Sequence, residues 1–197
     1  MAARLNANAL VDLDSFKSFV DAEGIDEQYD PIIKDFLNAS SDFIEKYCYR
    51  RFTEHDYTEA YSGDGTPTLH LNQWPVTEIK SVSIDVKREF STPLDSSQYD
   101  LLTDQTGDAY GIEFLDGCFP EGQRNILVNY KAGYTLAKMP SDIKLACTML
   151  SAYYYEKREG SFSISSKTKG DEVITYIQGI PKDVIDLISK YKRVESQ

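Results

Sequence analysis

The sequence predicts an α+β protein in which a helical core of about four helices carries an inserted antiparallel β-module. Apolar residues recur at helical spacing near both ends of the chain, and they alternate in the middle. Clusters of Gly, Asp and Pro separate the short middle segments, as turns do between strands. The predicted helical core comprises residues 1–56 and 132–197 with a C-terminal arm, and the predicted β-module comprises residues 57–131.

Two helices are predicted before the β-module. The first covers residues 12–24, with Asp12 suited to cap its start. The second covers residues 29–52 and begins with an Asp30–Pro31 pair, which is typical of an N-cap and first turn. The apolar residues that share a helical face are Leu13, Phe16, Phe19 and Val20 in the first helix, and Ile33, Phe36, Leu37, Ile44, Tyr47 and Cys48 in the second.

The middle of the chain predicts five to seven short strands, as a small antiparallel sheet or sandwich. Turns are expected at the Gly-Asp-Gly-Thr-Pro stretch and at Gly107–Asp108, because Gly and Asp tolerate the backbone angles that turns require. The strand-like segments are residues 57–71, 76–86, 98–117 and 124–134.

Helical spacing returns at residues 140–158, where Pro140 precedes the periodic residues. Residues 159–179 contain many Ser and Lys and predict either a mobile loop or an extended arm. A last helix is predicted at residues 181–193, starting at Pro181.

The junction at residues 129–150 has two interpretations. A strand, a glycine loop and a helix N-terminus in succession are also the layout of many phosphate sites. However, Asp142 falls in the first helical turn and would repel an anion, and Gly133 is the only glycine of the loop. We therefore expect a structural joint between the β-module and the helical core.

Charge is distributed unevenly over a chain whose net charge is −11. Residues 1–56 carry −6, residues 57–130 carry −8, and residues 131–197 carry +3. Proteins that clamp nucleic acid need Lys and Arg to replace counterions, so this balance argues against such a clamp. Attraction between the acidic part and the basic end of neighbouring copies, and an ordinary drift of surface charge, both remain open.

No motif for catalysis, metal binding or cofactor binding is found. The two histidines, His55 and His70, have no ligand at metal-binding spacing. Residues 62–67 lack the helix and lysine of a phosphate loop, and residues 104–111 lack the bidentate Glu of a calcium loop. We therefore predict no enzyme, no cofactor and no metal.

Three cysteines lie far apart without a CxxC spacing, and their odd number argues against a disulfide framework. The N-terminal residues lack the apolar core of a signal peptide, and no apolar run approaches the roughly 20 residues that cross a bilayer. These features predict a soluble protein made in a reducing compartment. The cysteines are Cys48, Cys118 and Cys147.

Three groups of residues together resemble the head–tail connector (adaptor) proteins of long-tailed bacteriophages, over residues 10–193. A helix ends in an aromatic-Arg-Arg-Phe segment, a Leu-x-Leu strand is followed by Trp-Pro-Val and a Ser-Val strand, and a Tyr-x-Ala-Gly-Tyr turn precedes Pro and a helix. These residues are Tyr49, Arg50, Arg51 and Phe52; Leu69, Leu71, Trp74, Pro75, Val76, Ser81 and Val82; and Tyr130, Ala132, Gly133, Tyr134, Pro140, Tyr155 and Arg158.

The resemblance implies a structural role in the virion neck, for a protein made in the host bacterial cytoplasm. Adaptors of this family form a ring, usually a dodecamer, beneath the portal protein, and the ring carries stopper or tail-completion proteins. DNA passes through the ring without sequence-specific binding, and an acidic channel wall suits this passage by repulsion. Two alternatives stay open: a stopper or tail-completion protein of the neck, and a β-sandwich carbohydrate-binding module that uses Trp74.

The residues expected to bind partners lie near the C-terminus. Part of the arm can add a strand to an exposed sheet edge of a neighbour or of the portal. The basic end of the last helix is expected to dock on the portal. The alternative for the arm is a disordered loop, and the alternative for the last helix is a solvated face. The partner-binding residues are Ile174, Tyr176 and Ile177 in the arm, and Lys182, Lys190, Tyr191, Lys192 and Arg193 at the end.

Overall fold

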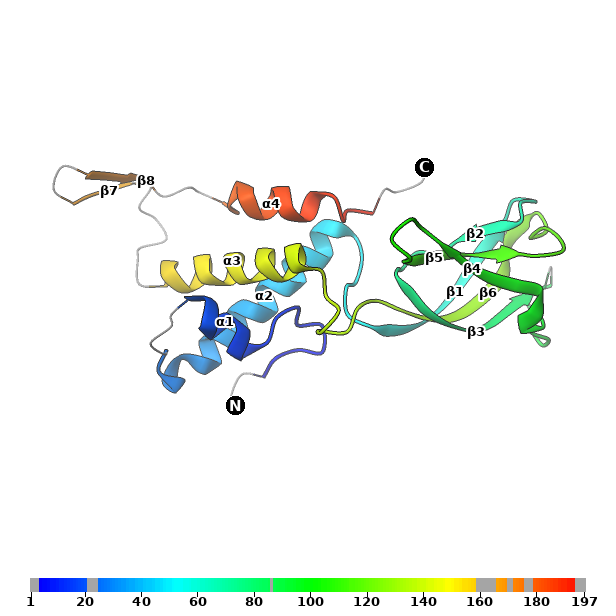
Figure 1. Cartoon of the computed structure of the whole chain (residues 1–197), viewed down its shortest axis with the longest axis horizontal. Coiled ribbons are helices and arrows are strands. Elements are labelled where there is room, and N and C mark those ends of the chain that lie inside the picture. The colour runs from blue at the N-terminus through cyan, green and yellow to red at the C-terminus, as the bar shows by residue number, and fades with distance from the viewer. Residues whose placement is uncertain are drawn as a thin grey trace. The chain divides into compact units, whose positions relative to one another are not determined.

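The computed structural model describes residues 4–20, 25–85, 87–158, 166–169, 172–175 and 179–193 (Figure 1). The chain divides into a helical unit, Met1–Phe52 with Leu136–Gln197, and a β unit, Thr53–Thr135. The predicted α+β class is therefore confirmed, since helices and antiparallel sheets occupy separate parts of the chain.

Four helices make up most of the helical unit, and α3 packs against both α2 and α4 (Figure 1). Between α3 and α4, strands β7 and β8 pair with each other as an antiparallel hairpin. The elements are α1 (Leu13–Val20), a 3-10 turn (Glu27–Tyr29), α2 (Asp30–Cys48), α3 (Ser141–Lys157), β7 (Ser166–Lys169), β8 (Glu172–Thr175) and α4 (Lys182–Ser189).

The predicted start of α2 is wrong by one residue. The N-cap is Tyr29, because the preceding 3-10 turn continues directly into the helix, and the carboxylate of Asp26 caps that turn instead. Asp30 already lies in the first helical turn, where a negative charge suits the helix dipole. Its carboxylate forms an ion pair with Lys17 of α1 at 2.5 Å. The predicted cap of α1 is observed, since Asp12 accepts the Ser15 N–H at 2.8 Å.

Small polar side chains allow α2 and α3 to approach closely. The hydroxyl of Ser151 lies 2.9 Å from Ser40 Oγ and 2.8 Å from the Cys147 carbonyl oxygen. Ser41 donates to the Leu37 carbonyl oxygen and lies 3.6 Å from Cys147 Sγ. All four of the side chains Ser40, Ser41, Cys147 and Ser151 are fully buried, and the hydroxyl groups find their partners within the seam, in each other or in the helix backbone.

The three cysteines should differ sharply in reactivity. Cys48 and Cys147 are fully buried, and burial raises the pKa of each thiol to about 11, whereas Cys118 is exposed. Only the thiolate reacts, so at pH 8 we expect one fast-reacting thiol per chain with Ellman's reagent and three in denaturant. Cys118→Ser should remove the fast phase; a fast phase that survives this substitution would contradict the burial of the other two.

The β unit contains two three-stranded antiparallel sheets with strand orders β1-β6-β3 and β2-β5-β4. Their inward side chains form one apolar core, in which Val82, Ile112, Phe119, Ile126 and Val128 are fully buried. Alternation along the strands directs Val82, Ile112, Ile126 and Val128 to one face of each sheet, whereas Phe119 enters the core from the loop between β5 and β6. The strands are β1 (His55–Gly63), β2 (Thr68–His70), β3 (Val76–Ile84), β4 (Tyr99–Thr103), β5 (Ala109–Phe114) and β6 (Gly122–Ala132).

A set of hydrogen-bonded polar side chains also borders this core. Tyr130 is fully buried, and its hydroxyl donates to Glu59 Oε2 at 2.7 Å. Tyr61 donates to the same carboxylate oxygen and lies 3.2 Å from the Tyr130 hydroxyl. The Asn72 amide donates to Glu59 at 3.2 Å and its backbone N–H donates to Tyr61. Burial and the hydrogen bond to Glu59 raise the pKa of Tyr130, and the same causes raise the pKa of Tyr61.

The two chain crossings of the β unit meet at its base. A parallel bridge joins Thr53 to Tyr134, and the Glu54 N–H donates to the Tyr134 carbonyl oxygen at 3.1 Å. Between them Gly133 adopts φ +114°, and its N–H donates to the Pro75 carbonyl oxygen at 2.9 Å. Gly133 therefore lies at the structural joint that the sequence predicts, where the chain leaves the β unit.

Gly133→Ala is expected to destabilise the chain by about 2 kcal/mol, because a Cβ there would lie 2.5 Å from the Thr53 carbonyl oxygen at a φ that L-residues avoid. Gly107→Ala is the matched control: its φ is +87°, but nothing lies within 4 Å of the added Cβ. Urea unfolding should show a smaller loss for the control, about 1 kcal/mol. Equal losses would indicate that backbone angle alone, rather than the close approach to Thr53, requires glycine.

Candidate partner-binding surface

The predicted partner-binding residues fall into three places. Lys182 begins α4, and its ammonium pairs with Asp186 at 2.5 Å, which raises the pKa of this lysine. Ile174 lies in β8, which pairs with β7, and its register partner is Lys167. Tyr176 and Ile177 lie outside the described residues.

The other four residues, Lys190 to Arg193, follow α4 and lie at the C-terminal end of α2. Because α4 ends at Ser189, the predicted helix to residue 193 is too long. Lys190 pairs with Asp142 of α3, which raises the pKa of Lys190. The ring of Tyr191 packs edge-on against Phe52 at 5.9 Å between centroids. The Arg193 backbone N–H donates to the Cys48 carbonyl oxygen at 2.9 Å.

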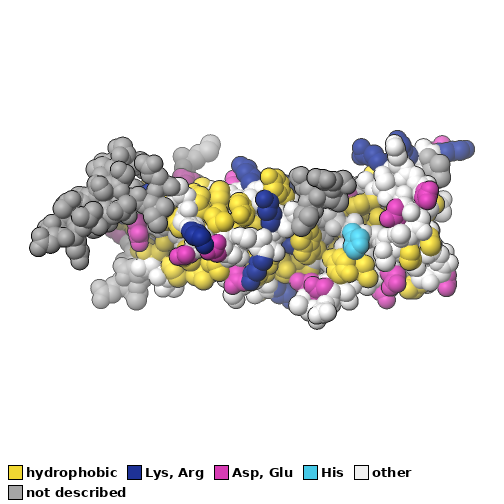
Figure 2. Space-filling model, turned by 90° about the horizontal axis from the view of Figure 1, so that it is seen from above, with side chains coloured by type: hydrophobic (Ala, Val, Ile, Leu, Met, Phe, Trp, Pro, Cys, Tyr) yellow, Lys and Arg dark blue, Asp and Glu magenta, His cyan; other side chains and the backbone are white. Residues whose placement is uncertain are grey.

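Lys192 lies over two tyrosines of the α2 end. Its ammonium is 5.5 Å from the Tyr47 ring centroid and 5.3 Å from the Tyr49 ring centroid, within the range of cation–π attraction. Arg50 lies 4.8 Å from the Phe52 ring in the same way. These cations surround the C-terminal end of a helix, where the helix dipole favours positive charge. Figure 2, seen from the α4 side, shows Lys and Arg side chains near the middle of this face.

The aromatic residues of the α2 end, which lie beside these cations, are not among the predicted partner-binding residues. Tyr49 adopts a left-handed conformation with φ 53° directly after α2, and its side chain is 54% exposed. Tyr47, assigned to the predicted core face, is only half-buried. Tyr and Arg are enriched where proteins bind one another, so the aromatic-Arg-Arg-Phe segment that begins at Tyr49 was the available signal in the sequence. The cluster of Tyr47, Tyr49, Lys190, Lys192 and Arg193 is named the α2-end cluster below; Arg50 lies beneath it and is buried.

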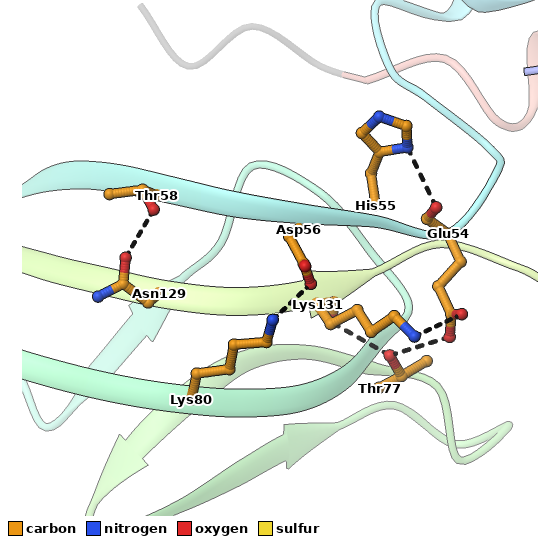
Figure 3. A network of polar contacts seen from close by, with 8 residues as sticks. All are labelled: Glu54, His55, Asp56, Thr58, Thr77, Lys80, Asn129 and Lys131. Carbon is orange, nitrogen blue, oxygen red and sulfur yellow. Dashed lines mark hydrogen bonds and ion pairs between the residues drawn. The ribbon is translucent and has the colours of Figure 1, made fainter. Parts of the chain in front are cut away.

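A second polar surface covers the outward face of the β1-β6-β3 sheet (Figure 3). Lys131 pairs with Glu54 at 2.7 Å, and Lys80 pairs with Asp56 at 2.8 Å. The Asp56 pairing lowers the pKa of this carboxyl, and the Glu54 pairing raises the pKa of Lys131. Such exposed cross-strand pairs contribute little stability each, and they show the arrangement of a solvated sheet face.

Neither surface has the composition of a catalytic centre. Over the residues that the structure describes, no group of three His, Cys, Asp or Glu side chains is placed to hold a metal ion. His55 and His70 lie on β1 and β2, each beside a tyrosine ring. In the described part of the chain, no helix has the length and apolar character to cross a membrane. The α2-end cluster instead combines cations with aromatic rings, such as Lys192 beside Tyr47 and Tyr49.

A sequence model of the family described as head completion protein matches residues 9–194. Comparison with curated proteins gave no match. The match covers both the helical unit and the β unit.

Solved structures from gene transfer agent particles share the fold. A chain in the neck of the native particle, computed with C12 symmetry, is 19% identical, with a TM-score of 0.61 over 99% of this chain and 94% of that chain. A chain in the neck of the empty particle, computed with C6 symmetry, is 18% identical, with a TM-score of 0.62 over 99% and 95%. A chain of the native virion is 19% identical, with a TM-score of 0.62 over the same shares.

Proposed function

Because the chain belongs to the head completion protein family, we propose that it is the adaptor, or head–tail connector, in the neck of a tailed phage or phage-like particle. It joins the DNA-filled head to stopper or tail proteins and has no catalytic role. The observation that carries the proposal is the family match over residues 9–194, to which the shared fold of neck proteins adds support.

The adaptor acts as a ring of identical copies, with twelve as the expected number. A similar chain lies in a neck computed with C12 symmetry, and a closed ring requires that one surface of each copy fit a different surface of the next. DNA passes through the ring. The net charge of −11 repels the phosphate backbone overall, which suits passage without sequence-specific binding.

The C-terminal part of the chain docks on the portal protein. Lys182 and Lys192 present their ammonium groups at the surface, whereas Tyr191 and the backbone of Arg193 hold the segment on the helical unit. Ile174, Tyr176 and Ile177 of the arm bind the portal as well, and Lys190 adds a further cation. An acidic surface on the portal is the complement that these side chains require.

The test is to mix the purified chain with the portal protein of the same particle and to image the mixture by electron microscopy. A ring directly against the portal supports the adaptor; a ring one layer further, bound only after another protein, identifies a stopper. Deleting residues 159–197 would be a poor test of docking, because α4 buries Val184 and Ile188 in the helical unit.

Charge reversal tests the docking end without disturbing the core. Lys182→Glu should weaken portal binding by about tenfold, since charges that face a partner control association. Lys80→Glu is the control, because Lys80, like Lys182, is a paired surface lysine. Undiminished binding of Lys182→Glu would contradict the role assigned to the C-terminal part.

A further inference from the structure

A stripe of apolar side chains runs along α2 beside the face that forms the core. Its members, Ile32, Phe36, Ala39, Phe43 and Tyr47, follow one another at intervals of four, three, four and four residues. Such spacing places them on one side of a helix. They are named the α2 stripe.

The α2 stripe is only partly covered by the helical unit. Ile32 is 37% exposed, Ala39 is exposed, and Phe36, Phe43 and Tyr47 are half-buried. Its neighbours Ile33, Leu37 and Ile44 on the core side are, in contrast, fully buried. The 19-residue helix α2 thus has two neighbouring apolar faces, and packing within the chain buries only one of them completely.

Aromatic contacts and cations border the α2 stripe. Phe43 stacks on Tyr47 at 6.1 Å, and Phe36 packs against Tyr154 of α3 at 6.0 Å. The ammonium of Lys157 lies 4.3 Å from the Tyr153 ring, and that of Lys192 lies 5.5 Å from the Tyr47 ring. Lys192 thus contacts a member of the stripe directly, and Lys157 is linked to Phe36 through Tyr153 and Tyr154, whose rings lie 6.0 Å apart. These two lysines are named the basic rim.

The opposite flank of α2 has the opposite charge. Asp35, Asp42 and Glu45 lie roughly a third of the way round the helix from the α2 stripe, because successive residues are separated by about 100°. The Asn8 amide donates to both Asp42 and Glu45 at 2.9 Å, and Asp35 is exposed. These three carboxylates are named the acidic flank.

We propose that the α2 stripe is the surface through which one copy of the chain packs against the next copy in the ring, with its basic rim facing the neighbour's acidic flank. The proposal rests on the proposed ring function. A closing ring needs two different surfaces on every copy, and this helix supplies an aromatic basic one and an acidic one on different sides. Buried aromatic anchors with complementary charges around them are the usual composition of such interfaces.

Photo-crosslinking tests which molecule covers the α2 stripe. Benzoylphenylalanine placed at position 43 of the full chain, in rings assembled on the portal, is expected to yield chain-to-chain adducts. Mass spectrometry should map the crosslinked peptide to the acidic flank of another copy. Adducts between two positions 43, within one chain, or with the portal alone would each overturn the proposal.

A matched pair of variants tests whether the contact holds the ring together. Phe43→Asp should lower the yield of rings about tenfold or more, as loss of an interface anchor does. Phe19→Asp is the control, because Phe19 of α1 is 53% exposed and lies off the stripe. Circular dichroism of both variants must show the wild-type helical signal, and Phe43→Ala replaces Phe43→Asp if it does not.

The ring assay also separates this proposal from the proposed function. If the wild-type chain forms no ring on the portal, the adaptor function itself fails. If the wild-type chain and Phe43→Asp form rings equally well, the adaptor function holds and the role of the α2 stripe is wrong.

Discussion

Replacing Tyr130 by alanine is expected to lower the free energy of unfolding by about 4 kcal/mol, measured by urea denaturation. The ring of Tyr130 is fully buried between Val128 and Ala132 along β6, and truncation of such a ring leaves a cavity that costs about 3–5 kcal/mol. Glu59 also loses a hydrogen-bond donor in a half-buried position. A loss below 1 kcal/mol would contradict the central place of Tyr130 in the β unit.

Tyr130→Phe is the matched variant, because it keeps the ring and removes the hydroxyl alone. Its loss should be about 1–2 kcal/mol, the usual result of one unmade hydrogen bond to a charged group.

The raised pKa of Tyr130 also gives the variant a pH signature. The folded chain keeps the Tyr130 hydroxyl protonated, whereas the unfolded chain loses this proton near the ordinary tyrosine pKa of 10.0. The stability that this hydroxyl contributes is therefore complete below pH 10 and is lost as pH rises above it. The slope is about 1.4 kcal/mol per pH unit for one group. Between pH 10 and 11, wild type should therefore lose stability faster than Tyr130→Phe, and parallel losses would contradict the burial of a neutral hydroxyl.

Ser151→Leu is expected to destabilise the chain by about 4 kcal/mol. The side chain lies in the α2–α3 seam, where overpacking costs about 1–3 kcal/mol. The substitution also removes the hydroxyl that lies 2.9 Å from Ser40, and an unsatisfied buried hydroxyl adds about 1–3 kcal/mol.

Ser151→Ala is the control for size, since alanine fits the seam and loses only the hydroxyl. We expect a loss of about 1 kcal/mol in the same urea experiment. If both variants lose the same amount, the helices are less closely packed at this seam than the structure shows.

The elements of the fold were largely predictable because local patterns determine them. Val128 and Tyr130 alternate with polar residues, as a half-buried strand requires, and the predicted strand is confirmed. The start of α2 was not predictable from Asp30–Pro31, because a 3-10 turn continues into the helix. The pairing of β1 with β6 joins segments about 70 residues apart, and no local pattern encodes it.

The surfaces were less predictable than the fold, for a physical reason. Spacing places Phe36 and Tyr47 on the apolar side of α2, but it does not tell how wide a sector the neighbouring helices cover. The residues from Lys190 to Arg193 were identified as partner-binding candidates, yet no local pattern indicates that Tyr191 packs on Phe52. Contacts between distant segments decide which side chains stay accessible.

The bridge between Thr53 and Tyr134 has a consequence for how such proteins diversify. The two ends of the β unit lie side by side at this bridge. The two parts of the helical unit on either side of it in the sequence therefore need not move apart to accommodate it. Loops, strands or a whole sheet can then be exchanged beyond the bridge while α2 and α3 keep their seam. The helical unit can therefore keep its packing while the β unit changes in length or composition.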